Sequence, residues 1–301
     1  MEPAPVVSDP RAAATGLRST AAAYVALTKP RIIELLLITT VPPMAVAAGG
    51  WPGTWLVLAT LVGGTLSAGG ANALNSYHDR DIDAVMRRTS RRPLARHRVP
   101  PARARAFGWA LGASGFVVLW AFANLLAAVL STAALLFYVF VYTRWLKRTT
   151  PQNIVIGGAA GAAPVLVGWA AVTGSLALPA WVLFAIVFAW TPPHFWALAL
   201  RYREDYEAAG VPMLQVVAGT ERTIRQMILY VGVTILFSLG LVPVAGMRWI
   251  YLGAAVLLGA WFLVESARLA VRPWRAMSIF GYSTVYLAVL FASMLVDRLV
   301  F

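Results

Sequence analysis

The sequence predicts an all-α membrane protein, built as a polytopic bundle of about nine transmembrane helices. Hydrophobic residues make up 60% of the 301 positions and charged residues only 12%, whereas a soluble domain carries roughly 25% charged residues. Long apolar runs alternate with short polar segments, and the basic residues gather in every second polar segment. This pattern is typical of a chain that crosses a membrane repeatedly.

Each span is placed by its apolar run, because a helix needs about 20 apolar residues to cross the hydrocarbon core. Only the short Ala123-Asn124 stretch marks the boundary between the third and fourth runs, so a smaller number of spans also fits the sequence. The nine runs cover residues 32–50, 54–74, 106–123, 125–143, 154–173, 180–200, 226–246, 249–267 and 277–296.

The basic residues predict the orientation of the bundle. All but two of the 25 Lys and Arg residues lie on one side, in the N-terminal segment and alternate connections; the exceptions are Arg248 and Arg298. Since cytoplasmic loops are enriched in Lys and Arg, we expect the amino terminus inside and the carboxyl terminus outside. The formal charge of +13 then reflects topology, and we expect no nucleic-acid partner.

Composition also divides the chain and suggests its compartment. Residues 1–24, rich in Ala, Pro and Ser, are expected to form a disordered cytoplasmic tail, and residues 25–301 a single transmembrane domain. Glu2 and Asp9 argue against an organelle transit peptide, which favours a bacterial plasma membrane. The chain has no cysteine, which excludes disulfides and cysteine-ligated haem, iron–sulfur or zinc sites.

The most informative polar segment lies at the inner end of the second span. Asn75, Asp79 and Asp83 are spaced four residues apart, so a continuous helix would stack them on one face and turn Asp81 towards water. Their oxygens suit Mg²⁺, which takes one or two carboxylates together with substrate phosphates. A polar helix end balanced by nearby arginines is the alternative, but three carboxylates within five residues are unusual in a chain with 12 acidic residues.

Basic residues near this segment could bind phosphate oxygens. Arg88 and Arg92 follow the aspartate segment, and the guanidinium of arginine can form two parallel hydrogen bonds to a phosphate group. Lys147 and Arg148 follow the fourth span, and Lys29 precedes the first. Topology alone also draws such residues to cytoplasmic loops, and Lys147 could instead extend to the membrane interface. The neighbouring aspartates favour a diphosphate site.

The fifth and sixth spans contain further unusual residues. Pro192 and Pro193 should kink the sixth span and free backbone carbonyls beside a cavity or a packed neighbour. His194 is the only histidine inside a span, and an ionisable group at such depth is a candidate for function; a hydrogen-bonded structural histidine is the alternative. Gly157 and Gly161 form a small-xxx-small pattern, which we interpret as close helix packing.

Seven blocks between about residues 27 and 215 resemble the UbiA superfamily of intramembrane prenyltransferases. The single block that holds Asn75, Asp79 and Asp83 marks the superfamily, while the Pro-Pro-His and Asp-Tyr-x2-Ala-Gly stretches point to its haem branch. The seven blocks are Leu27-Thr-Lys29-Pro30-Arg31, Asn75-x3-Asp79-Arg-Asp81-Ile-Asp83, Arg88-Thr-x2-Arg92-Pro93, Tyr142-Thr-x2-Leu146-Lys147-Arg148, Asn153-Ile-Val-Ile-Gly-Gly, Thr191-Pro-Pro-His194-Phe-Trp and Asp205-Tyr-x2-Ala-Gly-Val-Pro-Met.

The resemblance implies a central cavity in the bundle and a specific reaction. A farnesyl group would pass from farnesyl diphosphate to a vinyl group of protoheme IX, with addition of water, in haem biosynthesis. One or two Mg²⁺ ions would bind with the diphosphate. Membrane lipid surrounds such a protein, and haem A synthase or terminal oxidase assembly proteins are the protein partners that it suggests.

The resemblance also assigns residues. Asn75, Asp79, Asp83 and Asp205 would be catalytic, with the three aspartates as metal ligands. Quinone-type relatives have more aspartates in the second motif, so a second metal site here remains open. The diphosphate would contact Lys29, Arg88, Arg92, Lys147 and Arg148, and the haem-pocket candidates are Trp190 and His194.

Three other functions fit parts of the sequence. A quinone precursor or chlorophyllide could be the acceptor, although the haem-branch blocks argue against it. A secondary transporter would place ion-binding carboxylates near the bilayer midplane on broken helices, whereas these carboxylates lie at one interface beside arginines. A structural membrane subunit would need neither cluster.

Overall fold

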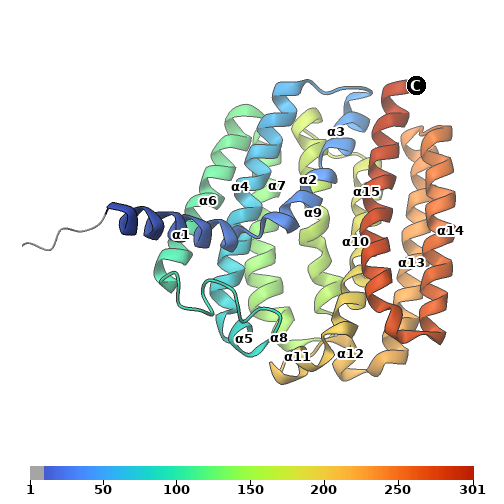
Figure 1. Cartoon of the computed structure of the whole chain (residues 1–301). Helices are drawn as coiled ribbons and strands as arrows, with labels where there is room; N and C mark the ends of the chain where they lie inside the picture. Colours follow the sequence, from blue (N-terminus) through green and yellow to red (C-terminus); the bar gives the residue numbers. More distant parts are fainter. Residues whose placement is uncertain (1–9) are drawn as a thin grey trace, which may run out of the picture.

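The computed structural model describes residues 10–301, which form a bundle of long helices that run roughly side by side (Figure 1). Within these residues, eight helical stretches are long and apolar enough to cross a membrane, and Arg18–Thr28 with Ile33–Ala48, bent by 50°, can be counted as a ninth. The eight contain α4 (Thr54–His78), α6 (Pro101–Phe122), α7 (Leu125–Leu136) with η1 (Phe137–Leu146) and α8 (Lys147–Thr149), α9 (Asn153–Thr173), α10 (Leu178–Arg201), α13 (Gly219–Ala245), α14 (Trp249–Val271), and η2 (Pro273–Arg275) with α15 (Ala276–Val300). The expected helical membrane bundle is confirmed.

The amino-terminal segment differs from its expected disorder where the structure describes it. Helix α1 (Pro10–Thr28) contains residues 10–24 of the segment that composition predicted to be disordered; residues 1–9 lie outside the described part. The segment is rich in alanine, which has the highest helix propensity. Ala23 and Leu27 are buried and tie the end of α1 to the bundle. Figure 1 shows α1 lying across the other helices rather than along them.

The run expected to be one continuous span over residues 32–50 is broken in the middle. Helix α2 (Pro30–Ile38) ends before Thr39, and α3 (Val41–Ala48) begins with Pro42 and Pro43 in its first turn. Proline lacks the N–H that would continue the ladder, and it disfavours helical backbone in the residue before it. The hydroxyls of Thr39 and Thr40 bond back to the carbonyl of Leu36 and satisfy this end of α2.

The boundary between the third and fourth apolar runs is a true helix break. The Asn124 side chain accepts a hydrogen bond from the Ala127 N–H at 2.9 Å and caps α7. The Asn124 amide also donates to the carbonyl of Ala170 at 2.7 Å and thereby links α7 to α9. Helices α4 and α6 approach closely through glycines: a Cβ on Gly70 would lie 2.6 Å from the backbone oxygen of Gly108.

The polar connections gather at one end of the bundle. The short helices α5 (Arg80–Val85), α8, α11 (Arg203–Ala208) and α12 (Leu214–Val217) lie there, opposite the carboxyl terminus (Figure 1). Because α5 and α11 follow directly on α4 and α10, residues from distant parts of the chain meet at this end. This convergence builds the site described next.

Candidate active site

The backbone keeps the Asn75, Asp79 and Asp83 spacing across a helix junction. Helix α4 ends at His78 and α5 begins at Arg80. The Asp79 N–H still donates to the Asn75 carbonyl at 2.9 Å, and the Asp83 N–H donates to the Asp79 carbonyl at 2.7 Å. All three side chains are buried. The predicted stacking is therefore present although the helix is not continuous.

Asp79 stands at the centre of a buried polar cluster. Its Oδ2 accepts hydrogen bonds from Asn75 Nδ2 at 2.9 Å and from Lys147 Nζ at 2.5 Å. Its Oδ1 is buried and receives no hydrogen bond from any side chain or backbone group that the structure describes. A buried carboxylate oxygen without a partner is costly, so this atom is the clearest acceptor for an added cation.

Lys29 completes the cluster from the end of α1. Its Nζ donates to Asn75 Oδ1, which fixes the amide so that Nδ2 faces Asp79. Lys29 has φ 54° and ψ 63°, a left-handed conformation that is uncommon outside glycine. Strained backbone of this kind concentrates at functional sites, and here it turns the amine of Lys29 inward before Pro30 starts α2.

Asp83 and Asp205 have separate arginine partners. Arg92 Nη1 donates to both oxygens of Asp83, at 2.8 and 2.9 Å. Asp205 accepts from Arg87 Nε at 3.1 Å and from the Arg88 N–H at 3.0 Å. Burial by itself would raise the pKa of Asp205, but the hydrogen bonds from Arg88 and Arg87 outweigh it and lower that pKa below its usual range.

The three proposed metal ligands are not assembled into one group. Over residues 10–301, no three His, Asp or Glu side chains come together in an arrangement that could hold a metal ion. Asp205 instead fastens α11 to the loop after α5, since both of its oxygens are used by Arg87 and Arg88. Arg88 in turn reaches the Tyr206 hydroxyl at 3.3 Å.

A π-helix brings in a residue that the sequence interpretation missed. In η1, the Thr143 hydroxyl donates to the carbonyl of Tyr138, five residues back, at 2.8 Å, and it accepts from Asn75 Nδ2 at 3.0 Å. Short π segments often occur at functional sites. The wider turn places Thr143 on the Asn75 side and delivers Lys147 to Asp79. No sequence signal marks this shift.

Arg148 faces the same cluster from its outer side. It forms a two-point ion pair with Asp81, with both distances 2.8 Å. Asp81 is 61% exposed, as expected, but it is not simply solvated. The hydrogen bonds from Arg148 lower the pKa of Asp81 to about 2.

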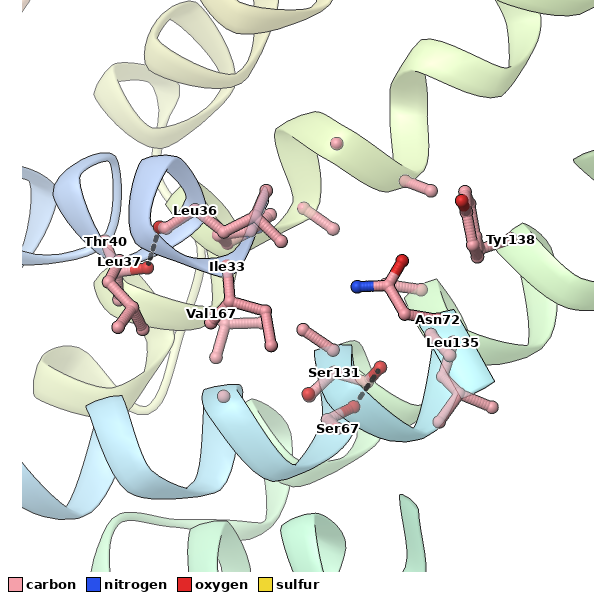
Figure 2. A pocket seen from close by; sticks show the side chains of 18 of the residues that line it. Ile33, Leu36, Leu37, Thr40, Ser67, Asn72, Ser131, Leu135, Tyr138 and Val167 are labelled. Atoms are coloured by element: carbon pink, nitrogen blue, oxygen red, sulfur yellow. Dashed lines mark hydrogen bonds between the residues drawn. The ribbon is translucent and has the colours of Figure 1, made fainter. Parts of the chain in front are cut away.

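An apolar cavity lies deeper in the bundle, beside this polar cluster. It encloses about 840 Å³ of empty space, part of it open to the outside, among α2, α4, α7, η1 and α9. Figure 2 shows Asn72 and Tyr138 near one another on its wall, with Ile33, Leu36 and Val167 on other parts of the lining. Asn72 lies one helical turn from Asn75 on α4, so the cavity continues inward from the carboxylates.

The glycines of α9 have two different roles. A Cβ on Gly157 would collide with the ring of Tyr142, so close packing is confirmed for this position. Gly161 has open space around it and lines the cavity. The packing interpretation of Gly161 is therefore wrong: its missing side chain leaves room for the cavity.

His194 and Trp190 lie together in α10, away from the carboxylates. The His194 ring stacks between Trp190, at 4.2 Å between centroids, and Phe280, at 4.5 Å. His194 Nδ1 is 2.8 Å from the Ser283 hydroxyl, and Trp190 Nε1 donates to the Ser283 carbonyl at 2.8 Å. Pro192 and Pro193 lie inside α10, which continues beyond them to Arg201. These contacts fix the orientation of the His194 ring and engage its Nδ1.

Comparison with known proteins gives a consistent result. The sequence profile of the UbiA prenyltransferase family matches residues 36–295. A protein of Clavibacter michiganensis named protoheme IX farnesyltransferase is 56% identical over 282 residues, which cover 92% of each chain. A Saccharopolyspora erythraea protein named protoheme IX farnesyltransferase 1 is 56% identical over 291 residues, covering 95% of this chain and 93% of its own.

Solved structures of low sequence identity share the fold. A UbiA homologue from Aeropyrum pernix superposes with a TM-score of 0.73 at 19% identity, covering 90% of this chain and 98% of its own. A UbiA homologue from Archaeoglobus fulgidus, solved with DMAPP and Mg²⁺, gives a TM-score of 0.64 at 17% identity and covers 90% of this chain and 98% of its own. From its sequence and its fold together, the chain belongs to the UbiA prenyltransferase family, among relatives that are named protoheme IX farnesyltransferase.

Proposed function

We propose that this protein transfers the farnesyl group of farnesyl diphosphate to a vinyl group of protoheme IX, with addition of water. The observation that carries the proposal is the meeting of two unlike surfaces: buried carboxylates with the half-buried amines of Lys29 and Lys147 at one side, and an apolar cavity directly beyond them. A prenyl diphosphate has the same two parts. The curated relatives named protoheme IX farnesyltransferase supply the identity of donor and acceptor.

The charged groups of the cluster suit a diphosphate that becomes more negative as it leaves. Lys147 forms an ion pair with Asp79, and Arg92 forms one with Asp83. Lys29 donates a hydrogen bond to Asn75. Each of these three cationic groups can also interact with phosphate oxygens. Fixed positive groups at that position stabilise a transition state in which negative charge develops on the diphosphate. We assign Arg88 and Arg148 to the rim of the same diphosphate site.

The residues present fit a divalent cation that arrives with the diphosphate. Oδ1 of Asp79 is a buried carboxylate oxygen without a hydrogen-bond partner in the described part of the chain, and Asp83 supplies a second carboxylate nearby in sequence. Hard cations such as Mg²⁺ take oxygen ligands of this kind. Bound Mg²⁺ would help to neutralise the leaving diphosphate. We propose one or two ions. Each oxygen of Asp205 already accepts a hydrogen bond, from Arg87 or from Arg88, so we assign it first to holding that loop.

The bond changes follow from the substrates. The C1–O bond of farnesyl diphosphate breaks and its electron pair leaves with the diphosphate. The π electrons of the vinyl group form the new carbon–carbon bond, and water adds to the resulting cation and loses a proton. The apolar cavity wall limits the access of water to the farnesyl cation. Trp190 and His194 are our candidates for the haem pocket, with His194 Nε2 as the candidate iron ligand.

The proposal also covers the membrane in which the protein lies, its orientation and its partners. The chain is a multi-pass membrane protein, and we propose the bacterial plasma membrane with the charged end in the cytoplasm. Farnesyl diphosphate, a charged molecule, would then reach the site from the aqueous side. Haem A synthase or terminal oxidase assembly proteins would take over the product.

Mass spectrometry of extracted haems tests the function. Membranes that contain the protein are incubated with protoheme IX, farnesyl diphosphate and Mg²⁺, and a haem that carries one farnesyl group and one water is expected. Magnesium-dependent release of diphosphate with a quinone precursor, but no new haem, would move the proposal to another acceptor. Folded protein that releases no diphosphate with either acceptor would refute prenyl transfer.

A further inference from the structure

Asp81 lies between the two aspartates of the proposed active site but does not take part in the proposed chemistry. Its carboxylate, although 61% exposed, accepts two hydrogen bonds from Arg148: Nη1 to Oδ2 at 2.8 Å and Nη2 to Oδ1 at 2.8 Å. A two-point arginine–carboxylate pair fixes the orientation of the guanidinium as well as its position. Asp81 therefore decides where Arg148 points.

Arg148 connects this exposed pair to the buried Asp79. Its Nη2 lies 4.0 Å from Oδ1 of Asp79. However, Nη2 carries two hydrogens; one is used by Asp81, and the other by the backbone carbonyl of His78 at 2.9 Å. No hydrogen of Nη2 remains for Oδ1 of Asp79, and this buried oxygen has no hydrogen-bond partner within residues 10–301.

A small movement would change this arrangement. A hydrogen bond from guanidinium to carboxylate spans about 2.9 Å, so Arg148 released from Asp81 would need to move by only about 1 Å to donate to Oδ1 of Asp79. The lone pairs of that oxygen would then be shared with a guanidinium. A divalent cation would have to displace the guanidinium before it could bind.

We propose that Asp81 is a positioning residue that holds Arg148 back and so keeps Oδ1 of Asp79 open to the divalent cation that accompanies the diphosphate. This role rests on the proposed function, and it deepens it by naming what controls cation access to the site. Asp81 acts through Arg148 and touches no reacting atom. The other oxygen of Asp79 stays with Asn75 and Lys147 throughout.

Binding of Mn²⁺ alone to the purified full-length chain tests the proposal, with free Mn²⁺ measured by its electron paramagnetic resonance signal. Asp81→Asn should weaken Mn²⁺ binding about tenfold, the lower end of the range for outer-shell partners of metal ligands. Arg148→Gln added to Asp81→Asn should restore most of the affinity, because the competing guanidinium is gone. The Mg²⁺ concentration for half-maximal turnover should rise by a similar factor in Asp81→Asn, while kcat at saturating Mg²⁺ changes little.

Two controls separate this role from the loss of one negative charge. Glu204→Gln removes another exposed carboxylate at the same end of the bundle, one that pairs with Arg87 rather than Arg148, and it should leave Mn²⁺ affinity nearly unchanged. An effect that acts through water is also screened by salt, with a Debye length of about 3 Å at 1 M. The effect of Arg148 in contact with buried Asp79 should persist at high salt.

Unchanged Mn²⁺ affinity in Asp81→Asn, a loss that disappears at high salt, or a loss that Arg148→Gln does not relieve overturns the proposal. If Asp81→Asn does not fold, Arg148→Gln alone decides: it should bind Mn²⁺ at least as tightly as the parent, and weaker binding overturns the proposal. Product formation by the parent protein distinguishes failure of the Asp81 proposal from failure of the proposed function. Farnesylated haem from the parent, together with unaffected variants, refutes only the role of Asp81; a parent that makes no prenylated product refutes the function.

Discussion

At the scale of single residues, the site depends on the unequal surroundings of the two oxygens of Asp79. Oδ2 is held by Asn75 and Lys147, whereas Oδ1 is buried without a partner among the residues that the structure describes. The contacts of Oδ2 fix the position of the carboxylate, and the open Oδ1 leaves an acceptor for a cation. This difference between the two oxygens suits a carboxylate that must bind an ion without moving.

Replacement of Asp79 by Ala should abolish turnover, with a loss of at least about 100-fold, because a charged group aimed at the reacting centre is removed. Haem product is quantified by mass spectrometry, and the amount of protein in the membrane fraction should stay unchanged. Glu221→Gln is a matched control, since Glu221 forms an exposed ion pair with Arg225 within α13. Undiminished product from Asp79→Ala would remove Asp79 from the proposed metal site.

The pH dependence of the Asp81–Arg148 pair is a second prediction at this scale. The hydrogen bonds from Arg148 lower the pKa of Asp81 from 3.8 to about 2 in the folded protein. The pair therefore stabilises the fold above about pH 4, and this stabilisation is lost as the pH falls towards 2. Thermal unfolding in detergent of the parent and of Asp81→Asn should show a constant difference in Tm near neutral pH that shrinks in acid. A difference that grows on acidification would contradict this assignment.

At the scale of helices, some features follow from sequence and others need the packed bundle. The spacing of Asn75, Asp79 and Asp83 predicted their common face correctly, because the backbone hydrogen bonds continue through the α4–α5 junction. Pro42 and Pro43 carry a signal for the break after α2. By contrast, η1 shifts Thr143 towards Asn75 through a π turn, which depends on tertiary contacts. Local propensity contains no information on such a shift.

The cavity predicts chain-length selectivity. Gly64 lies in α4, eight residues from Asn72 and thus about 12 Å along the helix; it lines the cavity, and a Cβ added to it would meet no neighbouring atom within 4 Å. Gly64→Leu should fill this part of the cavity and raise the KM for farnesyl diphosphate at least about tenfold, a cost of about 1.4 kcal/mol. Dimethylallyl diphosphate, which is shorter, should be affected less. Steady-state kinetics with both donors provides the measurement.

A matched control for this substitution is Gly240→Leu in α13, where the glycine also has open space but does not line the cavity. It should leave both KM values unchanged. An equal loss with both donors in Gly64→Leu would mean that the cavity does not hold the far end of the farnesyl chain.

At the scale of the whole molecule, the site is assembled from segments far apart in the chain. Arg87 meets Asp205 across 118 residues, and Lys147 meets Asp79 across 68. Sequence motifs identified most of these residues singly, but they could not give the pairings, because each pairing depends on which helices become neighbours. Asp205 shows this: in the described residues it pairs with Arg87 and Arg88 rather than joining Asp79 and Asp83 in a three-carboxylate group, so its part in metal binding stays a prediction.

The orientation of the bundle is the prediction that connects the fold to the cell. The short helices α5, α8, α11 and α12 lie at one end (Figure 1), and we expect that end in the cytoplasm because Lys and Arg are concentrated in the connections to which these helices belong. The chain contains no cysteine, so single cysteines can report on either end without background. Glu207→Cys in α11 and Ser175→Cys between α9 and α10 are both at exposed positions. In spheroplasts with an intact plasma membrane, a membrane-impermeant maleimide should label the Ser175→Cys variant. It should label the Glu207→Cys variant only after lysis. The reverse pattern would place the diphosphate site outside the cell, away from the cytoplasmic supply of prenyl diphosphate that the proposed function assumes.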